Sequence, residues 1–264
     1  MAERRRVALV TGAYGAIGRA IAAGLVARPD HEVVVVGRDP ERLRQLVADL
    51  ERGGGAGRVR GELVDLSSHE DVRALGRRFT GPLDALVNAA AAAPRRRSVT
   101  AAGIEVVLAT NVLGYVWTLE ELLPALRRGR EPRVVNVASY WAGDLEVVEL
   151  EIVRRGYDND QAYRQSKQAN RMLTRAAAER LAPDGITVHA CHPGDVASKL
   201  SHDLGFGGAE SPEAGARTPL WLATRAEVPG ETGGYYEHER RAECRFSRDA
   251  AAVAALARRV AAYP

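Results

Sequence analysis

Tyr163 and Lys167 are the residues of this sequence best suited to proton transfer. They are four positions apart in a run of helix-forming residues, so a helix would place the phenol and the ammonium group on one face. A free phenol has a pKa near ~10, and a nearby positive charge lowers it toward neutrality. Taken alone, such a pair is more often part of a solvated helix surface, so its interpretation depends on the rest of the chain.

A glycine-rich stretch, Thr11-Gly12-Ala13-Tyr14-Gly15-Ala16-Ile17-Gly18, lies between the first expected strand and the first expected helix. Glycines at such a turn let the backbone approach a pyrophosphate, whose charge the helix N-terminus attracts. A glycine turn of purely structural purpose is the alternative. The position favours a dinucleotide-binding loop.

The end of the second expected strand bears on the choice of cofactor. An acid often binds the ribose 2′-hydroxyl at this point, but here the strand runs into Gly37 and Arg38. An arginine there favours a 2′-phosphate, which predicts NADP(H) rather than NAD(H). Arg19, just after the glycine stretch, is a second candidate cation or an ordinary solvated arginine.

Apolar β-branched runs alternate with amphipathic segments along the whole chain, as is typical of repeated βαβ units. Strands are expected near 6–11, 32–37, 58–64, 83–88, 132–138, 185–191 and 232–236. Helices are expected near 16–28, 40–52, 68–79, 101–128, 160–181, 212–225 and 249–261. This pattern predicts one NAD(P)-binding domain over residues 1–264. Its fold would be α/β, Rossmann-like and doubly wound, with about seven mostly parallel strands and helices on both faces.

Composition excludes several other classes. The 264 residues are 46% hydrophobic, enough for a sizeable core, yet no run reaches the ~18 apolar residues of a membrane span. The first residues lead into a strand rather than a signal-peptide core, so we expect a soluble, cytoplasmic protein. A net charge of +3 with short basic runs favours a solvated surface over nucleic-acid contact. The cysteine and histidine spacing predicts no metal site.

Further motifs, in order along the chain, resemble those of the short-chain dehydrogenase/reductase family in its compact form. They are Asp65-Leu66, Asn88-Ala89-Ala90, Asn111-Val112-Leu113-Gly114, Val135-Asn136-Val137-Ala138-Ser139 and Cys191-His192-Pro193-Gly194. The stretch from Ala162 to Asn170 is similar to the retinol-dehydrogenase-like branch. The resemblance covers nearly the whole chain.

The resemblance implies hydride transfer between NADP(H) and a small to medium ketone, aldehyde or secondary alcohol. Tyr163 would exchange the proton, and Lys167 would lower its pKa and hold the nicotinamide ribose. Ser139 would hydrogen-bond the substrate oxygen. Asn111 would shape a helical kink that holds a water. The alternatives are a helix N-cap for Asn111 and a strand-end hydroxyl bonding its own backbone for Ser139.

Two departures from the family pattern concern the cofactor-binding set. The implied set is Gly12, Tyr14, Gly15, Ala16, Ile17, Gly18, Arg38, Asp65, Leu66, Asn88, Ala89, Tyr163, Lys167, Pro193, Gly194 and Val196. Ala16 replaces a usual glycine, which leaves the glycine spacing of the extended, nucleotide-sugar-modifying branch. The stretch 88–91 lacks the second asparagine and the glycine of the family.

Substrate specificity is expected in the segments 140–160 and 195–210, which least resemble regular elements. Tyr140, Trp141 and Leu200 are the candidate contacts, and the second segment suits a mobile lid or a plain surface loop. The stretch 233–236 resembles the final edge strand of the family, which implies a homodimer or homotetramer.

Two other functions remain open at this stage. The extended-type glycine spacing is compatible with redox-neutral epimerisation or dehydration on a bound nicotinamide. A non-catalytic NADP-binding sensor or scaffold is the third hypothesis, although it does not need Ser139, Tyr163 and Lys167 together. The leading hypothesis is carbonyl reduction, with substrates that include those of secondary metabolism.

Overall fold

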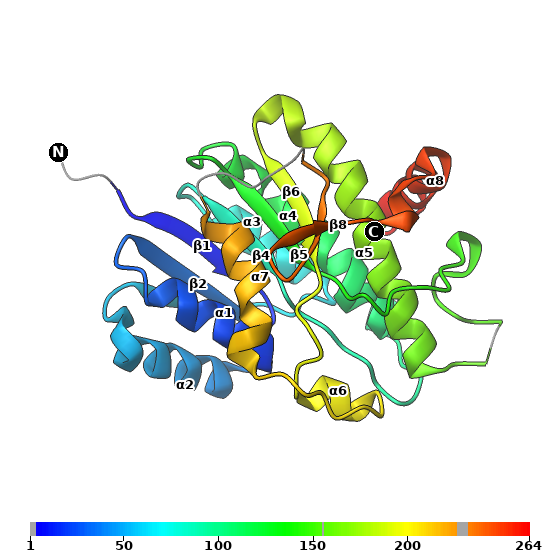
Figure 1. The fold of residues 1–264 in the computed structure, drawn as a ribbon, viewed down its shortest axis with the longest axis horizontal. Coiled ribbons are helices and arrows are strands. Elements are labelled where there is room, and N and C mark those ends of the chain that lie inside the picture. Colours follow the sequence, from blue (N-terminus) through cyan, green and yellow to red (C-terminus); the bar gives the residue numbers. More distant parts are fainter. Residues whose placement is uncertain (1–3, 155, 226–231) are drawn as a thin grey trace.

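The computed structural model describes residues 4–154, 156–225 and 232–264. Within them, eight strands form one sheet in the order β3-β2-β1-β4-β5-β6-β7-β8 (Figure 1). Their bounds are β1 Arg6–Val10, β2 His31–Gly37, β3 Val59–Leu63, β4 Ala85–Asn88, β5 Arg133–Val137, β6 Thr187–Cys191, β7 Tyr235–Glu237 and β8 Arg240–Ala242. Neighbouring strands are parallel except for the antiparallel pair β7 and β8. The expected mostly parallel, doubly wound α/β fold is confirmed, with one strand more than expected.

Helices cover both faces of the sheet. They are α1 Ala16–Val26, α2 Pro40–Leu50, α3 His69–Arg78, α4 Gly114–Leu126, α5 Asn159–Leu181, α6 Lys199–Asp203, α7 Pro212–Thr224 and α8 Ala250–Ala261. Helices α1, α2 and α7 lie on one face and α3, α4 and α5 on the other, while α8 packs on the outside of α5 (Figure 1). None of the helices in the described part of the chain combines the length and apolarity needed to cross a membrane.

The central strands are apolar on both sides because both faces are covered. In β1, Ala8 and Val10 belong to the core beneath α1, α2 and α7, whereas Leu9 belongs to the core beneath α3, α4 and α5. In β2, Val35 belongs to the first of these cores and Val34 to the second. Continuous apolar runs are typical of parallel strands buried between two helical layers, and they explain why the sequence pattern identified these strands.

The strand order reverses between β1 and β4. From β1 the chain proceeds outward through β2 and β3, and from β4 it proceeds the other way through β5 and β6. In open parallel sheets, ligands bind outside the carboxyl ends of the strands at such a reversal. The segments that follow β1, β4, β5 and β6 therefore share the edge where a cofactor site is expected.

The helix expected over 101–128 begins later, at Val106, and has a π-helical turn at Leu108–Leu113 before α4. A turn precedes it, in which Gly103 has φ +78°. The buried carboxylate of Glu105 accepts hydrogen bonds from the amides of Val107 and Leu108, both at 2.8 Å, and so satisfies the start of the helix. A carboxylate that accepts hydrogen bonds from these amides stabilises the start of the helix in the same way as an N-cap side chain.

Two short elements were not expected from the sequence. Helix α6 lies inside the segment 195–210, and Ser198 and Ser201 form a capping box at its start. Strand β8 follows β7 through a tight turn in which His238 and Glu239 have φ 48° and 60°. Five-residue helices and three-residue strands give too little periodicity to be recognised in sequence. The strand expected at 232–236 corresponds to β7. The prediction that it is the edge of the sheet is wrong, because β8 pairs with β7 and lies outside it.

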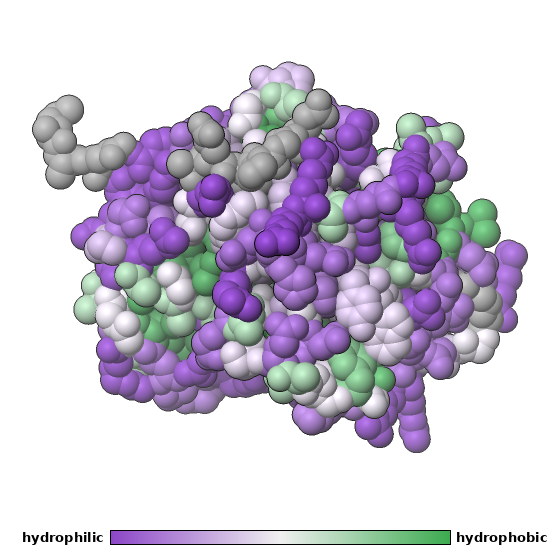
Figure 2. Space-filling view, in the orientation of Figure 1, coloured by the Kyte–Doolittle hydropathy of each residue, from purple (hydrophilic) through white to green (hydrophobic). Residues whose placement is uncertain are grey.

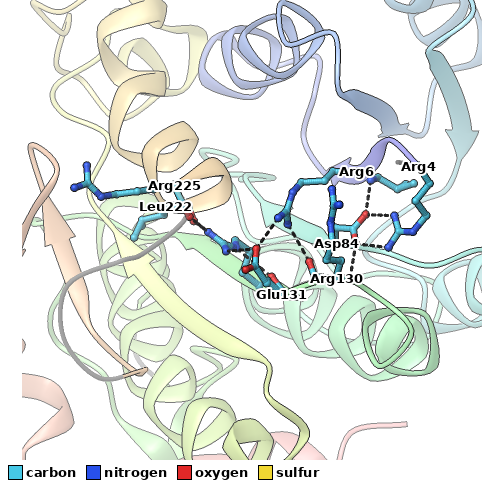
Figure 3. Close-up of polar contacts among 9 residues, drawn as sticks. Arg4, Arg6, Asp84, Arg130, Glu131, Leu222 and Arg225 are labelled. Atoms are coloured by element: carbon cyan, nitrogen blue, oxygen red, sulfur yellow. Dashed lines mark hydrogen bonds and ion pairs between the residues drawn. The ribbon is translucent and has the colours of Figure 1, made fainter. Parts of the chain in front are cut away.

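A polar network ties the amino ends of the strands together (Figure 3). Asp84 accepts two hydrogen bonds from the Arg4 guanidinium, both at 2.7 Å, and others from the amides of Val7 at 2.6 Å and Arg130 at 2.5 Å. Arg6 pairs with Glu131 at 2.5 Å. This network lies at the opposite end of the strands from the edge that carries the candidate site.

The surface in the view of Figure 2 is mostly hydrophilic, with hydrophobic residues in several separate places, one of them over α6 at the lower edge. Helix α6 contributes Leu200, and Leu204 follows as its C-cap; both side chains are partly exposed.

Candidate active site

Helix α5 positions both residues of the expected proton-transfer pair. Its N-cap is Asp158, whose carboxylate accepts a hydrogen bond from the amide of Gln161. Tyr163 and Lys167 lie on the buried face of α5, with 8% and 2% of their surface exposed. The Lys167 ammonium nitrogen is 5.6 Å from the centre of the Tyr163 ring. The helical spacing therefore brings the two side chains together as predicted.

Burial, rather than Lys167, dominates the acidity of Tyr163. Burial raises the pKa of Tyr163 to about 12, and the hydrogen bond with Ser139 opposes that rise. Ser139 is the group that lowers this pKa here, and the expected effect of a charged Lys167 on the phenolate stays a prediction. Tyr163 is consequently a protonated acid at neutral pH.

Lys167 is enclosed by groups that give little support to its charge. Its nitrogen donates a hydrogen bond to the carbonyl of Val137 at 2.8 Å, at the end of β5, and lies 5.5 Å from the centre of the Tyr115 ring. Burial lowers the pKa of Lys167 to about 7, an effect that the nearby thiol of Cys191 partly opposes. The residue therefore changes its charge within the physiological pH range.

Ser139 follows β5 directly and is buried. Its hydroxyl oxygen accepts a hydrogen bond from the amide of Trp141 at 3.1 Å and also bonds with Tyr163. The bond to the local backbone that the sequence suggested is present, and the role of Ser139 toward a substrate oxygen stays a prediction. A hydroxyl oriented by a backbone amide is well placed to donate its hydrogen to a substrate oxygen.

Asn111 is fully buried in the π-helical turn and not at a helix N-cap. Its side-chain oxygen accepts a hydrogen bond from the amide of Ala92 at 2.7 Å, and its nitrogen donates to the Ala92 carbonyl at 3.0 Å. The same nitrogen donates to the Ser166 hydroxyl at 3.1 Å. Asn111 lies in a π-helical turn, and its side chain joins the segment after β4 to α5, whereas its expected role in holding a water stays a prediction.

The glycine stretch after β1 requires glycine at its first and last positions. Gly12 has φ +66°, and a Cβ there would lie 2.5 Å from the Ala90 Cα; a Cβ on Gly18 would lie 2.3 Å from the Gly12 carbonyl oxygen. Gly15 is the N-cap of α1 in extended conformation, and Ala16 is the first residue of the helix. Ala16 thus occupies an ordinary helical position rather than the turn itself.

The N-terminus of α1 is free of side-chain caps. No side chain bonds its first amides and no acid lies in its first turn, whereas α2, α3, α5 and α7 are each capped by an Asp or Ser side chain. Amides left open at a helix N-terminus bind anions. The geometry around Gly15 and Ile17 therefore fits the pyrophosphate of a dinucleotide.

Tyr14 occupies the space beside the end of β2. Its hydroxyl donates to the Asp39 carbonyl at 2.7 Å, and a Cβ on Gly37 would lie only 2.0 Å from that hydroxyl. The Arg42 guanidinium stacks over the Tyr14 ring at 4.8 Å. Gly37 is therefore needed to admit the phenol, which in turn holds Arg42 at the end of the strand.

Arg38 is exposed and faces Asp65, its guanidinium 3.9 Å from the carboxylate. Arg38 and Arg42 therefore supply two cations near the site expected for the cofactor ribose. Arg19 pairs with Asp49 of α2 at 2.6 Å, which favours the alternative of an ordinary surface arginine.

The segment after β4 is held by residues other than the missing asparagine and glycine. The hydroxyl of Thr11 accepts hydrogen bonds from the amides of Ala89 at 3.1 Å and Ala90 at 3.4 Å. The hydroxyl of Tyr115 donates to the Ala90 carbonyl at 2.9 Å. Asn88 donates to Asn136 at 3.0 Å. This segment is fixed against β1 and α4 despite its departure from the family pattern.

Asp65 and Leu66 follow β3. Asp65 accepts hydrogen bonds from the amide and hydroxyl of Ser67, at 2.9 and 2.8 Å, so its carboxylate is oriented by the turn. Leu66 is buried, and its carbonyl would lie 2.7 Å from a Cβ on Gly114. Both residues follow the carboxyl end of β3, and their contact with an adenine ring stays a prediction.

The Pro193-Gly194 turn after β6 is fixed by Glu210. Gly194 has φ +97°, and a Cβ there would lie 2.4 Å from the Glu210 carboxylate. That carboxylate accepts a hydrogen bond from the Asp195 amide at 3.1 Å, and Val196 pairs with Glu210 in a single bridge. The turn and the buried Val196 therefore border the candidate site as a rigid unit.

The two expected substrate segments meet beside Ser139. The rings of Trp141 and Phe206 pack edge to face, with centres 5.0 Å apart. The rings of Tyr140 and His192 pack in the same way at 4.6 Å. Leu200 lies on α6, within the second segment. The aromatic contacts give this part of the site an apolar wall.

Several residues of the site could not be chosen from the sequence. Arg42 is one of many arginines, and its position four residues after Arg38 is the only hint of its place. Phe206 lies between glycines, which is a signal for an exposed apolar tip. Tyr115 lies in a helix whose distortion is invisible in the sequence.

The described geometry is that of a known family. The family described as short chain dehydrogenase matches residues 6–205. The chain therefore belongs to the short-chain dehydrogenase family, whose members are oxidoreductases acting on alcohol and carbonyl groups of small molecules.

Relatives agree with this assignment. A Streptomyces antibioticus protein named "Probable oxidoreductase" is 36% identical over 258 residues, covering 90% of this chain and 86% of its own. Mouse retinol dehydrogenase 13 is 29% identical, with 88% and 75% covered, which confirms the resemblance to the retinol-dehydrogenase-like branch. A Streptomyces protein whose assigned name is that of a daunorubicin C-13 ketoreductase is 34% identical, with 89% and 84% covered.

Solved structures share the fold. A protein of unassigned function from Mycobacterium paratuberculosis superimposes with a TM-score of 0.80 at 27% identity, covering 97% of this chain and 92% of its own. The Pseudomonas aeruginosa RhlG/NADP active-site complex superimposes with a TM-score of 0.69 at 29% identity, with 88% and 94% covered.

Proposed function

We propose that this chain is an NADP(H)-dependent carbonyl reductase or alcohol dehydrogenase acting on a small to medium ketone, aldehyde or secondary alcohol. One observation carries the proposal. The protonated phenol of Tyr163, bonded to Ser139 and next to Lys167, lies at the same sheet edge as the uncapped N-terminus of α1. An acid and a dinucleotide-binding loop at one edge are what hydride transfer to a carbonyl needs.

A bound nicotinamide supplies the hydride for reduction and accepts it in the reverse direction. Tyr163, protonated at neutral pH, donates its proton to the carbonyl oxygen. Ser139 donates a hydrogen bond to the same oxygen, where negative charge grows. Lys167, when charged, stabilises the phenolate that remains. The aromatic wall of Trp141 and Phe206 keeps water from the reacting atoms.

The preference for NADP(H) rests on Arg38 and Arg42. Two guanidinium groups near the end of β2 fit a 2′-phosphate. A guanidinium group binds a phosphate more strongly than it binds a hydroxyl group. The NADP complex of RhlG, a structural relative, supports the same choice. The relative named as a daunorubicin C-13 ketoreductase supports reduction of a ketone, including one from secondary metabolism.

We also propose that residues 1–264 act as one NAD(P)-binding domain, in the cytoplasm, and as a homodimer or homotetramer. The assembly follows from the family resemblance. Because β8 pairs with β7, the edge open to another copy at this end of the sheet is that of β8. Size-exclusion chromatography with light scattering checks the assembly, and a monomer across the micromolar range would refute it.

The central experiment follows NADPH consumption with a panel of ketones, aldehydes and quinones, alongside a Tyr163→Phe variant. We expect substrate-dependent oxidation of NADPH that falls at least ~100-fold in the variant, because general acid catalysis contributes about that much. A variant that keeps near-full activity would refute the role of Tyr163. Silence across the panel despite NADPH binding would favour the redox-neutral or sensor hypotheses.

A further inference from the structure

Arg171 is a buried cation that the hydride-transfer site does not by itself explain. It lies one helical turn beyond Lys167 and two beyond Tyr163 on the same face of α5, with 6% of its surface exposed. Within the described residues, no carboxylate lies within ion-pair distance of its guanidinium group. Burying an unpaired charge costs several kcal/mol unless other groups solvate it.

Most of the groups that solvate Arg171 come from residues 235–246, which are far from it in the sequence. Its guanidinium carbon lies 3.6 Å from the centre of the Tyr235 ring and 5.0 Å from that of Phe246. Its Nε donates to the Cys244 sulfur at 3.3 Å, and one Nη donates to the Glu243 carbonyl at 3.4 Å. The C-terminal segment 243–246, which runs beside α5, thus encloses the guanidinium group (Figure 1).

The remaining Nη reaches the candidate site. It donates to the main-chain carbonyl of Ser139 at 3.4 Å. The Ser139 hydroxyl in turn bonds with Tyr163, so Arg171 holds the backbone of the residue that contacts the candidate acid. A guanidinium group directs its donors in a fixed planar fork, whereas the ammonium of a lysine is a compact point charge and an apolar side chain donates no hydrogen bond.

We propose that Arg171 is a positioning residue, which fixes Ser139 by joining its carbonyl to the C-terminal segment at Glu243, Cys244 and Phe246. This inference rests on the proposed function, because the consequence of misplacing Ser139 is read in carbonyl reduction. Arg171 does not touch the substrate and acts through Ser139. A shift of the Ser139 hydroxyl by a fraction of an ångström weakens its bond to the growing negative charge.

The test compares kcat, KM and NADPH affinity in Arg171→Met and Arg171→Lys with those of the wild-type chain. Arg175→Met is the matched control, since Arg175 lies one turn further on α5, is only partly buried and, among the described residues, pairs with Glu179. We expect kcat to fall ~10- to 100-fold in Arg171→Met, with KM and NADPH affinity within ~2-fold, and no change in the control. Full kcat in Arg171→Met would overturn the inference.

A double-mutant cycle with Ser139→Ala separates positioning from general loss of structure. If Arg171 acts through Ser139, the double variant Ser139→Ala/Arg171→Met is no slower than Ser139→Ala alone. Losses that multiply would show that Arg171 acts by another route and overturn the inference. If the Met variant fails to fold, Arg171→Lys decides, with reduced kcat supporting the inference and full kcat opposing it. A wild-type chain inactive on every carbonyl would instead refute the proposed function.

Discussion

At the scale of single residues, burial has a larger effect on the site than pairing of charges. Tyr163 and Lys167 are both enclosed, and enclosure moves their pKa values in opposite directions, to about 12 and about 7. Each residue is thereby held toward its neutral form. Such a site starts the reduction with a full proton on the phenol and with a lysine poised between two charge states.

The titration of Lys167 predicts the pH dependence of reduction. Its pKa is lowered to about 7, so the ammonium group is present below pH 7 and is lost as the pH rises through it. Because the charged form stabilises the phenolate that Tyr163 leaves, we expect kcat for reduction to decline above pH 7. A kcat–pH profile checks this, with Lys167→Met as the comparison. A wild-type profile that rises between pH 7 and 9 would contradict it.

The two arginines near β2 give a cofactor prediction. A hydrogen bond to a charged group contributes about 1.5–3 kcal/mol, so Arg38→Ala/Arg42→Ala should weaken NADPH binding at least ~10-fold. The affinity for NADH, which lacks the ribose 2′-phosphate, should change by less than ~3-fold. Fluorescence titration of both cofactors measures the difference. Arg44→Ala is the control, since Arg44 is exposed and pairs with Glu41 on α2. Equal losses for both cofactors would argue against a 2′-phosphate site.

At the scale of elements, rigid and irregular parts divide the tasks. The proton-transfer residues come from the segment that follows β5, a strand buried along its length, and from the buried face of α5. The expected substrate contacts come from segments with a five-residue helix and glycines of positive φ, Gly205 and Gly208. Segments of this kind change conformation at low cost, which suits entry and release of substrate.

Phe206 is expected to hold the second segment over the site through its contact with Trp141. In Phe206→Ala the edge-to-face contact, worth about 0.5–1.5 kcal/mol, is lost. We expect KM for an apolar ketone to rise ~3- to 10-fold, with Tm within a few degrees of the wild type. Steady-state kinetics and thermal unfolding check this. Lys199→Ala on the exposed side of α6 is the control, and an unchanged KM in Phe206→Ala would remove the lid hypothesis.

Long elements could be predicted from the sequence, and local distortions could not. The strands near β1, β2 and β5 were recognisable because parallel strands are apolar on both sides. The π-helical turn around Asn111 depends on bonds to Ala92 and Ser166, which are 19 and 55 residues away. Similarly, the spacing of Tyr163 and Lys167 placed them together, but the pKa of each depends on burial that only the folded chain defines.

At the scale of the whole molecule, Asp84 secures the amino ends of the strands (Figure 3). Burial opposes its ionisation, but the bonds from Arg4, Arg130 and Val7 outweigh it and lower the pKa of Asp84 below its ordinary value. Stability from a carboxylate with a lowered pKa is present above its ordinary pKa and is lost as the pH falls through the lower value.

Asp84→Asn should lower the free energy of unfolding by about 3 kcal/mol, because it leaves buried donors poorly paired. The difference from the wild type should shrink in acid, where the wild-type carboxylate is itself protonated. Urea unfolding at pH 7 and below pH 4 measures both effects. Glu41→Gln, at an exposed surface pair, is the control. A loss below ~1 kcal/mol at pH 7 would show that the network contributes little.

The outer edge of the sheet has a consequence for behaviour at high concentration. Strand β8 is three residues long, and its Arg240 and Arg241 are exposed. A short edge rich in positive charge repels the same edge of another copy and offers few unpaired amides for a foreign strand. These features disfavour strand-to-strand aggregation at the β8 end of the sheet, where the strand edge is unpaired.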